Sequence, residues 1–318
     1  MKRPLITVVG SYATGLTMRV QRLPRKGETV LGTGYRTDFG GKGSNQAVGC
    51  ARLGAEVHFL TKIGNDSFGE MALRLYREEG INTTAVITTN HAPTGVGFIL
   101  VEEATGDNCI ALDAGANELL SAEEVGQHGD ALDRARVVLS QLEIPVETAG
   151  VAFARARASG VMTILNPAPV RPLPSSVLQV VDILTPNETE ARVLTERAPD
   201  AVATPAELAA DLIRLGVKQV VMTLGERGAL LVTSSSSKHF PAIQVQATDT
   251  TGAGDAFNAG LATSLAFGDT LEDAVQVGVV AGGLAVTRHG VIPSLPHRRE
   301  VLKAYHDARL PVPNWISS

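Results

Sequence analysis

The sequence has few of the features that mark exported, membrane-spanning or nucleic-acid-binding proteins. Its 318 residues include two cysteines, Cys50 and Cys109, which have no metal-binding spacing and cannot build a disulfide framework. The apolar start, Leu5–Gly10, is far too short for a signal core or a membrane span. A net charge of −5 argues against a nucleic-acid backbone as partner. We therefore expect a soluble, cytoplasmic protein without nucleic-acid or membrane partners.

Two common nucleotide-binding signatures are also missing. A P-loop requires GxxxxGK[ST], but Lys42 is followed by Gly43 and preceded by the wrong spacing. The first predicted strand leads into Gly10-Ser11-Tyr12-Ala13-Thr14-Gly15 instead of GxGxxG. This absence argues against a dinucleotide-dependent oxidoreductase on a doubly wound sheet.

The remaining pattern is that of an α/β protein of ordinary globular composition, with 44% hydrophobic and 19% charged residues. Short apolar or β-branched runs predict strands at Leu5–Gly10, Val57–Lys62, Val137–Gln141, Val161–Leu165, Val180–Leu184 and Gln219–Leu224. Helical patterns that end before a glycine lie at Ser44–Leu53, Phe68–Glu79, Thr148–Ser159 and Ala206–Leu215. Alternation of strands with such helices predicts a mainly parallel sheet flanked by helices.

Two stretches depart from this alternation. Thr17–Asp38 and Thr94–Leu112 have turn signals and extended patterns but no helical pattern. We expect lid segments at about 11–38 and 94–112, which form a small antiparallel sheet projecting from the core, although ordinary surface hairpins have the same pattern. Because no repeat or interdomain linker is evident, residues 1–318 are expected to form one domain.

The most informative segment is Thr-Asp-Thr-Thr-Gly-Ala-Gly-Asp-Ala-Phe-Asn, residues 248–258. It precedes a predicted helix, Ala256–Phe267, whose N-terminus would present three lightly covered backbone N–H groups to an anion: Gly252, Ala253 and Gly254. Asp255 would repel that anion unless a substrate hydroxyl lies between them and gives its proton to the carboxylate. Taken alone, the segment also fits a glycine-rich turn with a capping aspartate.

Other polar or glycine-rich segments follow predicted strands. Asn187 and Glu190 are three residues apart, and their oxygens suit hydrated Mg²⁺ or, alternatively, a capping box. Further segments of this kind are Gly40–Asn45, Glu143, Asn166–Pro169 and Thr223–Gly228. The carboxyl ends of parallel strands lie at one edge of a sheet, so these segments should converge on one crevice.

In their order and spacing, these motifs resemble those of the ribokinase-like (PfkB) carbohydrate kinases. The resemblance extends from about Leu5 to Pro296 and is strongest to the ribokinase branch, because of Gly-Gly-Lys-Gly-Ser-Asn-Gln-Ala, Leu-Asn-Pro-Ala-Pro, Thr-Pro-Asn-Glu-Thr-Glu and Ala-Val-Thr-Arg-His-Gly. It implies a ribokinase-like fold, ATP-dependent phosphorylation of a pentose or related sugar, and a homodimer formed through the lid.

The resemblance also implies roles for individual residues. Asp255 would be the general base, and Gly252, Ala253 and Gly254 the anion hole. The sugar would be bordered by Gly41, Lys42, Gly43, Asn45 and Glu143, together with Asp255. The nucleotide would contact Asn187, Thr223, Gly225, Gly228 and Gly254. Asn187 and Glu190 would organise Mg²⁺ through water, and K⁺ would bind, partly through carbonyl groups, at Asp249, Thr251, Ala285, Arg288, Gly290 and Ser294.

The sequence departs from the family pattern where ribokinases carry Gly-Ser-x-Asn-x-Asp. In ribokinases, the side chains of that Asn and that Asp grip the sugar hydroxyls. Here Ala13 stands in place of the Asn and Gly15 in place of the Asp. Ribose should therefore bind poorly, and a larger or differently hydroxylated compound should be preferred. Val279, where the family often has a polar residue near adenine, leaves the nucleotide preference open.

Two alternatives remain at this stage. One is a kinase for a nucleoside or another non-ribose compound. The other is a catalytically silent regulator that binds sugar or nucleotide. Asp255 and the intact Gly-Ala-Gly argue against the regulator, because a pure binding protein has no use for a base aimed at the γ-phosphate.

Overall fold

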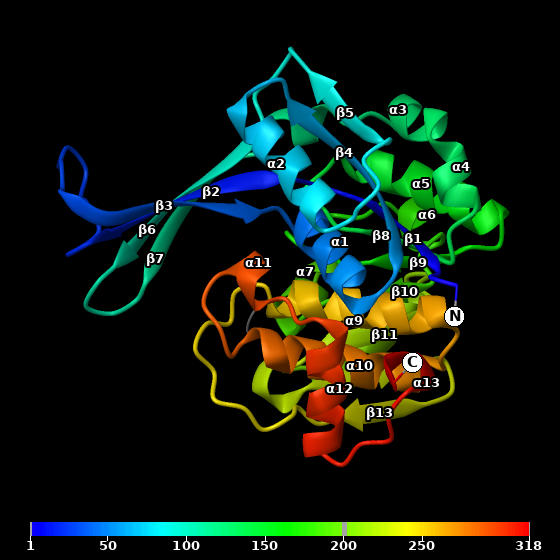
Figure 1. The fold of residues 1–318 in the computed structure, drawn as a ribbon. Helices are drawn as coiled ribbons and strands as arrows, with labels where there is room; N and C mark the ends of the chain where they lie inside the picture. The colour runs from blue at the N-terminus through cyan, green and yellow to red at the C-terminus, as the bar shows by residue number, and fades with distance from the viewer. Residues whose placement is uncertain (1, 199–201, 318) are drawn as a thin grey trace.

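The computed structural model describes residues 2–198 and 202–317, which form a large sheet between helices and a smaller sheet that projects from it (Figure 1). The large sheet has nine strands, in the order β13 (Ser237–Phe240), β12 (Ala229–Val232), β11 (Gln219–Thr223), β10 (Ile183–Leu184), β9 (Met162–Leu165), β8 (Val137–Ser140), β1 (Leu5–Val9), β4 (Glu56–Gly64) and β5 (Val86–Thr89).

The large sheet is parallel from β5 to β11 and antiparallel only at the β11–β12–β13 edge. Its central strands are apolar on both faces, as the burial of all four residues of β8 illustrates, and such strands need a covering layer on each side. The predicted fold class, a mainly parallel sheet flanked by helices, is confirmed.

One predicted strand is shorter than expected. Val180–Leu184 was expected to be extended throughout, but β10 contains only Ile183 and Leu184. The Asp182 carboxylate accepts a hydrogen bond from the backbone N–H of Thr163 at 3.0 Å, so a side chain replaces part of the backbone pairing there.

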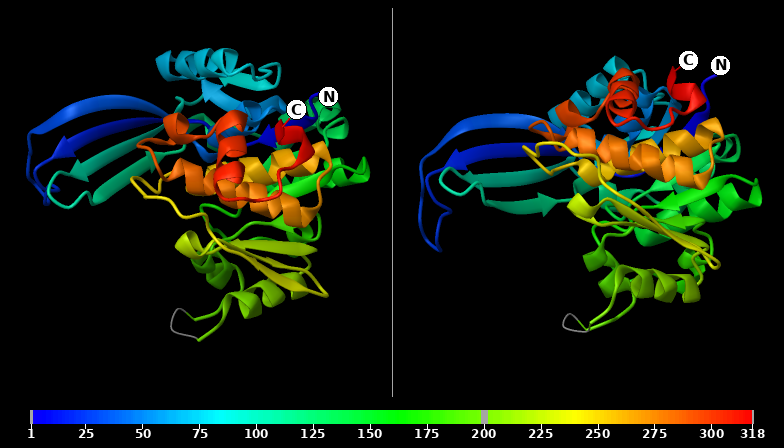
Figure 2. Two further views of the ribbon diagram at one scale, coloured as in Figure 1. Left: turned by 60° about the horizontal axis from the view of Figure 1, so that its bottom comes forward. Right: turned by 90° about the horizontal axis from the view of Figure 1, so that it is seen from below.

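Helices cover both faces of the large sheet (Figure 2). One face packs in a core with α1 (Lys42–Leu53), α2 (Ser67–Glu78), α9 (Ala253–Phe267), α10 (Leu271–Ala285) and α12 (Arg298–Asp307). The other packs with α3 (Ala122–Gln127), α4 (Gly129–Asp133), α5 (Val146–Ala158), α6 (Ser175–Leu178), α7 (Glu188–Leu194) and α8 (Pro205–Arg214). Short helices lie at η1 (Gly115–Leu119), η2 (Gly225–Arg227), α11 (Val291–Ser294) and α13 (Asn314–Ser317).

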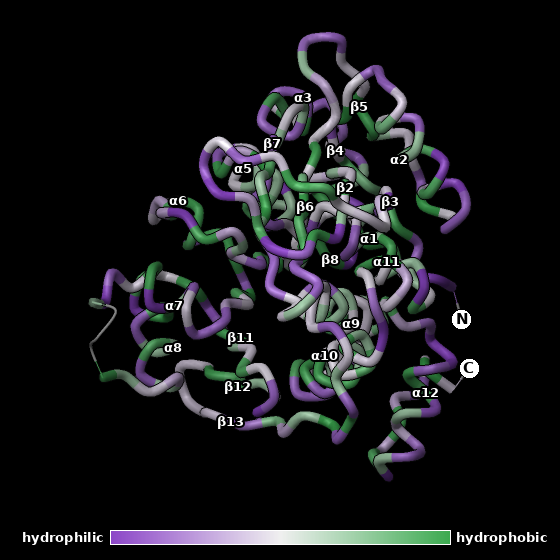
Figure 3. Tube along the Cα trace, turned by 90° about the vertical axis from the view of Figure 1, so that its left-hand side faces the viewer, coloured by the Kyte–Doolittle hydropathy of each residue, from purple (hydrophilic) through white to green (hydrophobic). Residues whose placement is uncertain are grey.

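Helices α1 and α9 approach each other unusually closely. A Cβ added at Gly49 would lie 2.6 Å from the Cβ of Ala259, and one added at Gly260 would lie 3.0 Å from the carbonyl oxygen of Val277 in α10. Small residues therefore allow α9 to lie tightly between α1 and α10. Figure 3 shows hydrophobic stretches along α9 and α10, as expected for helices buried on most sides. Within the described residues, no helix is both long and apolar enough to cross a membrane.

The smaller sheet has the strand order β3 (Gly32–Gly40), β2 (Ala13–Val20), β6 (Gly95–Glu102) and β7 (Asn108–Asp113). The predicted antiparallel arrangement is wrong for its centre, where β2 and β6 pair in parallel. The reason is topological: β2 follows β1 and β6 follows β5, so both strands leave the carboxyl edge of the large sheet in the same direction. The outer pairs, β2–β3 and β6–β7, are antiparallel.

Candidate active site

The first feature of the site is the uncapped N-terminus of α9. The helix begins at Ala253, three residues earlier than predicted, because Gly252 adopts a left-handed conformation with φ 82°. A Cβ at Gly252 would lie 2.6 Å from a methyl carbon of Val291, whereas one at Gly254 would meet nothing within 4 Å. No side chain caps the helix, as expected of a helix N-terminus that binds an anion, although the Ala253 N–H donates to the carbonyl of Thr250 at 3.3 Å.

The second feature is Asp255, whose carboxylate lies in the first turn of α9 and is only 5% exposed. Its Oδ2 accepts a hydrogen bond from Asn45 Nδ2 at 2.8 Å, and its Oδ1 accepts one from Gln46 Nε2 at 2.9 Å. Both donors are in the first turns of α1. Asn45, which was predicted to border the sugar, thus donates to Asp255, while its buried Oδ1 has no partner among the described residues.

Gln46 connects Asp255 to the ends of two strands. Its Nε2 also donates to Asn166 Oδ1 at 3.1 Å, and its Oε1 accepts from Gln141 Nε2 at 2.6 Å. Sequence reasoning used Gln46 and Asn166 only as parts of motifs and gave Gln141 no role. The sequence did contain a signal for Gln46, because an apolar run follows it in α1 and indicates that its amide is buried. A buried amide needs hydrogen-bond partners.

A second chain of hydrogen bonds reaches α9 from β10. Thr185 Oγ1 donates to Asn258 Oδ1 at 2.6 Å, and Asn258 Nδ2 donates to the carbonyl of Gly254 at 2.8 Å. Asn166 Nδ2 donates to the carbonyl of Thr185 at 3.3 Å and so joins the two chains. The first turn of α9 is therefore fixed both through Asp255 and through its backbone.

Two of the residues predicted to border the sugar, Lys42 and Glu143, are joined at the N-terminus of α1. Glu143 Oε2 accepts from Ser11 Oγ at 2.5 Å and from the Lys42 backbone N–H at 2.8 Å. The charge of Asp255 raises the pKa of the Lys42 ammonium, burial opposes this shift, and Glu143 and Glu190 add to it. Lys42 therefore stays cationic close to the carboxylates.

Two glycines allow α1 to begin against the start of β2. Gly41 has φ 86°, and an added Cβ would lie 2.7 Å from the Cα of Tyr12. A Cβ at Gly43 would lie 2.4 Å from the backbone N of Ser11. These contacts require glycine, so the close approach that the sequence suggested at these positions is first of all an approach of backbone to backbone.

Asn187 and Glu190 form the capping box that was the alternative to a metal site. Asn187 Oδ1 accepts from the Glu190 N–H at 2.8 Å, and Glu190 Oε2 accepts from the Asn187 N–H at 2.8 Å. Burial raises the pKa of Glu190, while the bond from Asn187 and the charge of Lys42 oppose the shift. Residues 2–198 and 202–317 contain no cluster of three or more His, Cys, Asp or Glu that could hold a metal directly.

The predicted cation loop folds as one unit around Asp249. Its Oδ1 accepts from the Thr251 N–H at 2.9 Å and its Oδ2 from the Gly290 N–H at 3.1 Å. Burial raises the pKa of Asp249, but these hydrogen bonds outweigh it and leave the pKa below its usual value. Val286, between Ala285 and Arg288, accepts from the Asp249 N–H at 3.1 Å.

The side chains of the other two predicted cation residues have partners within the protein. Arg288 forms an ion pair with Glu300, and Ser294 is buried with its hydroxyl donating to the carbonyl of Val291 at 2.8 Å. Any contribution of these two residues to a cation would therefore come from their carbonyl groups.

The predicted nucleotide residues are brought together at the end of β11. Thr223 is bridged to Asn187, and its N–H donates to the carbonyl of Pro186 at 2.9 Å. Gly225 has φ 61° with open space around it, whereas a Cβ at Gly228 would lie 2.0 Å from the carbonyl oxygen of Phe240. Gly228 thus serves the β12–β13 hairpin, and Gly225 is the residue that leaves room for a ligand.

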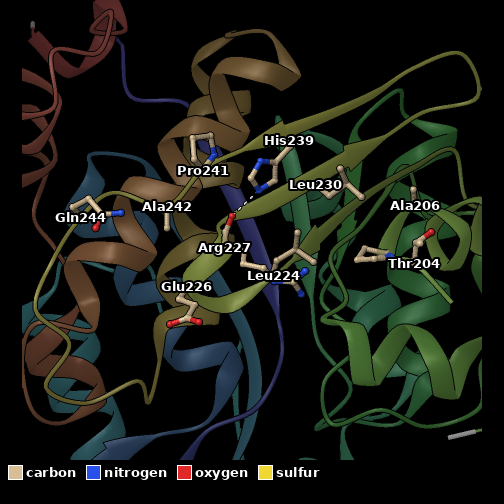
Figure 4. Close-up of a pocket in the computed structure, with 11 residues that line it drawn as sticks. Thr204, Ala206, Leu224, Glu226, Arg227, Leu230, His239, Pro241, Ala242 and Gln244 are labelled. Atoms are coloured by element: carbon tan, nitrogen blue, oxygen red, sulfur yellow. Dashed lines mark hydrogen bonds between the residues drawn. The ribbon is translucent and has the colours of Figure 1, made fainter. Parts of the chain in front are cut away.

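A cavity of about 500 Å³ lies beside this turn, between the β12–β13 hairpin and the N-terminus of α8 (Figure 4). It is lined by residues that include Leu224, Glu226, Arg227, Leu230 and His239. His239 Nε2 lies 2.7 Å from the carbonyl oxygen of Arg227. Thr223, Gly225 and Gly228 do not line this cavity themselves, although their immediate neighbours Leu224, Glu226 and Arg227 do.

Comparison with known proteins identifies the family. A family model described as pfkB family carbohydrate kinase matches residues 3–298. The chain is 38% identical over 303 residues to a ribokinase of Haemophilus influenzae, which covers 95% of this chain and 98% of that protein. It is 35% identical over 292 residues to a deoxyribokinase of Salmonella typhi, which covers 92% and 95%.

Solved structures agree. The crystal structure of a Thermotoga maritima ribokinase has a TM-score of 0.88 at 36% identity, covering 95% of this chain and 99% of that one. The structure of Arabidopsis thaliana ribokinase complexed with ribose and ATP has a TM-score of 0.87 at 32% identity, covering 96% and 99%. The chain belongs to the pfkB family of carbohydrate kinases. The predicted ribokinase-like fold and sugar kinase class are confirmed.

The hydrogen bond from Gln46 to Asp255 generates a prediction. Replacing the amide in Gln46→Leu should lower kcat about tenfold or more while the KM values for sugar and ATP change little, because a hydrogen bond to a charged group contributes roughly 1.5–3 kcal/mol. Gln46→Glu places a second carboxyl group beside Asp255, where repulsion between two carboxylates disfavours the doubly ionised pair. The acid limb of the kcat–pH profile, measured by steady-state ADP release, should then move to higher pH.

The matched control is Gln141→Leu, which removes an amide from the same network without touching Asp255. It should lower the melting temperature and leave the acid limb in place. A Gln46→Glu profile that superimposes on that of the wild type would show that Gln46 does not tune the base.

Proposed function

We propose that the protein transfers the γ-phosphoryl group of ATP to a hydroxyl of a sugar or polyol, with Asp255 as general base. The observation that carries this proposal is the combination of a carboxylate fixed by Asn45 and Gln46 with an uncapped helix N-terminus two residues away. Arabidopsis ribokinase, whose structure includes ribose and ATP, supports the pairing of substrates. A silent binding protein would gain nothing from this arrangement.

In the proposed reaction, the acceptor hydroxyl lies between Asp255 and the N–H groups of Gly252, Ala253 and Gly254. Its O–H bond breaks as the proton passes to Asp255, a bond forms from that oxygen to the γ-phosphorus, and the bond from phosphorus to the ADP oxygen breaks. The helix N-terminus and the Lys42 ammonium offset the negative charge on the moving phosphoryl group. The free Oδ1 of Asn45 accepts a second sugar hydroxyl, beside Gly41, Gly43 and Glu143.

We also propose that Mg²⁺ accompanies the nucleotide at the β10–α7 junction. Asn187 and Glu190 supply oxygen atoms, and the capping box leaves Glu190 Oε1 free for a metal-bound water molecule. When bound, Mg²⁺ neutralises phosphate charge. Thr223 and Gly225 border the same place and contact the nucleotide, with Gly254 at its γ-phosphate end.

We propose a cytoplasmic location. Both cysteines are free, as is usual in a reducing compartment. We propose that the smaller sheet, segments 11–38 and 94–112, acts as a lid that excludes water, and that two copies of the chain pair through it. Apolar side chains on this sheet are exposed: Tyr35 is 62%, Phe98 55%, Ile110 58% and Leu112 54% exposed. An apolar surface of this kind is typical of an interface.

The dimer is tested by sedimentation. Phe98→Glu/Ile110→Glu changes both faces of the smaller sheet and should convert a dimer to a monomer in sedimentation velocity runs. Leu215→Glu alters a side chain that is 43% exposed at the end of α8 and should leave the dimer intact. A wild-type protein that sediments as a monomer at micromolar concentration would contradict the proposal.

The proposed reaction is tested by coupled ADP release over pentoses, hexoses, polyols and nucleosides. Asp255→Asn keeps the size and most hydrogen bonding of the side chain but cannot accept the proton. The kcat for the best acceptor should fall at least about 10²-fold with ATP affinity retained, because general-base catalysis contributes roughly this factor. Asp307→Asn, at a carboxylate that is 66% exposed, is the control and should turn over normally. Near-wild-type turnover by Asp255→Asn would remove Asp255 from the mechanism.

We propose that K⁺ binds at the loop formed by Asp249, Thr251 and the Ala285–Gly290 segment. The ionised Asp249 and nearby carbonyl groups suit a monovalent cation, which would order the loop that precedes the anion hole. Replacing Na⁺ or tetramethylammonium by K⁺ at constant ionic strength should raise kcat severalfold, and Asp249→Asn should abolish the difference. A wild-type rate that is the same in all three salts would rule out an activating site.

A further inference from the structure

The start of β2 has one side toward the core and one toward the site. Tyr12 points into the core, where its ring packs edge-on against Tyr76 with centroids 6.2 Å apart. The neighbouring Ser11 points the other way and reaches Glu143. Successive side chains of an extended segment alternate between its faces, so Ala13 and Gly15 lie on the same side as Ser11 and Glu143.

Asp38 lies on that same side. Gly15 and Asp38 are directly opposite each other in the antiparallel β2–β3 pair, and opposite residues of such a pair share a face. A Cβ added at Gly15 would be 3.6 Å from the Cβ of Asp38. The Asp38 carboxylate therefore borders the space that a side chain at position 15 would fill.

The surroundings of this space are small and close to the anion hole. On its other flank, Gly95 and Gly97 of β6 pair with Ala13 and Gly15. The nearest side chain of β6 is Ile99, whose Cδ1 would lie 3.5 Å from a Cβ at Gly15. Strand β3 contacts α11, and Val291 of α11 packs on Gly252. Asp38 thus belongs to the wall of the site and not to the distant tip of the smaller sheet.

Asp38 is held in place but keeps one oxygen available. Its Oδ2 accepts from Arg36 Nε at 2.7 Å and from Thr17 Oγ1 at 3.1 Å. Its Oδ1 has no hydrogen-bond partner in the described part of the chain, and the side chain is 39% exposed. A fixed carboxylate with a free oxygen can accept charge-assisted hydrogen bonds from sugar hydroxyls.

We propose that Asp38 is the specificity-determining carboxylate of this kinase and that the preferred acceptor is a six-carbon sugar or polyol. This inference rests on the proposed kinase function. The Cβ of Asp38 lies 3.6 Å from the place of a Cβ at position 15, so its carboxylate is displaced by more than the length of one carbon–carbon bond, which is about 1.5 Å. With the reacting hydroxyl fixed at Asp255, a longer acceptor is needed to reach Asp38 across the gap left by Ala13 and Gly15.

The test compares D-ribose with a panel of hexoses and hexitols in the ADP-release assay. The wild type should have a higher kcat/KM for at least one six-carbon compound than for D-ribose. Asp38→Ala should raise the KM for that compound about tenfold or more, with the KM for ATP unchanged, because a charge-assisted hydrogen bond is lost. Asp38→Asn, which keeps the shape of the side chain, should have a smaller effect of the same kind.

A reciprocal variant moves the carboxylate from position 38 in β3 to position 15 in β2. Gly15→Asp/Asp38→Ala should lower the KM for D-ribose and raise that for the six-carbon compound, and the contacts of 3.5–3.7 Å around a Cβ at Gly15 leave room for the change. Asp107→Ala, which removes the same charge from the β6–β7 turn, is the matched control and should leave both KM values unchanged.

Different results would overturn different conclusions. If the wild type phosphorylates a six-carbon compound but Asp38→Ala leaves its KM unchanged, or if D-ribose is the best acceptor of all, the role of Asp38 is wrong and the kinase function stands. If no compound in the panel stimulates ADP release, the proposed function fails and this inference fails with it.

Discussion

The buried Asp255 carboxylate needs hydrogen-bond donors, and much of the surrounding structure positions them. A buried carboxylate is costly unless its oxygens are hydrogen-bonded, and here both oxygens accept from neutral amides, those of Asn45 and Gln46. Neutral donors fix the orientation of the carboxylate without a direct ion pair that would neutralise its charge. The cationic Lys42 acts on Asp255 through space and has no hydrogen bond to it among the described contacts.

This arrangement requires two helices from distant parts of the chain to pack at a closely defined separation. The amides come from α1 and the carboxylate from α9, and these helices pack where Gly49 faces Ala259. Larger residues at this crossing would separate the donors from the acceptor. The same packing brings Arg52, near the end of α1, to the carbonyls of Ile292 and Leu295 at 2.6 and 3.0 Å, so α1 also anchors the chain after the proposed cation loop.

Local patterns in the sequence predicted most of the fold, because strand runs, helical runs and glycine ends are local properties. The parallel pairing of β2 with β6 was missed since strand direction depends on where distant segments leave the large sheet. The grouping of Asn45, Glu143 and Asp255 was predicted from the family resemblance. The contacts of Gln46 and the place of Asp38 opposite Gly15 were not, because side-chain partners and strand register arise only in the folded chain.

The sequence separation within the site has a consequence for how the protein is made. Strands β8 to β13 lie in chain order in the sheet, so this half can assemble from neighbouring segments as they leave the ribosome. The bonds from Asn45 and Gln46 to Asp255, in contrast, join residues 210 and 209 positions apart. An unfinished chain that ends before α9 contains Lys42 and Asn45 but lacks the Asp255 carboxylate. The proposed general base is therefore absent from nascent chains until nearly the whole protein has been synthesised.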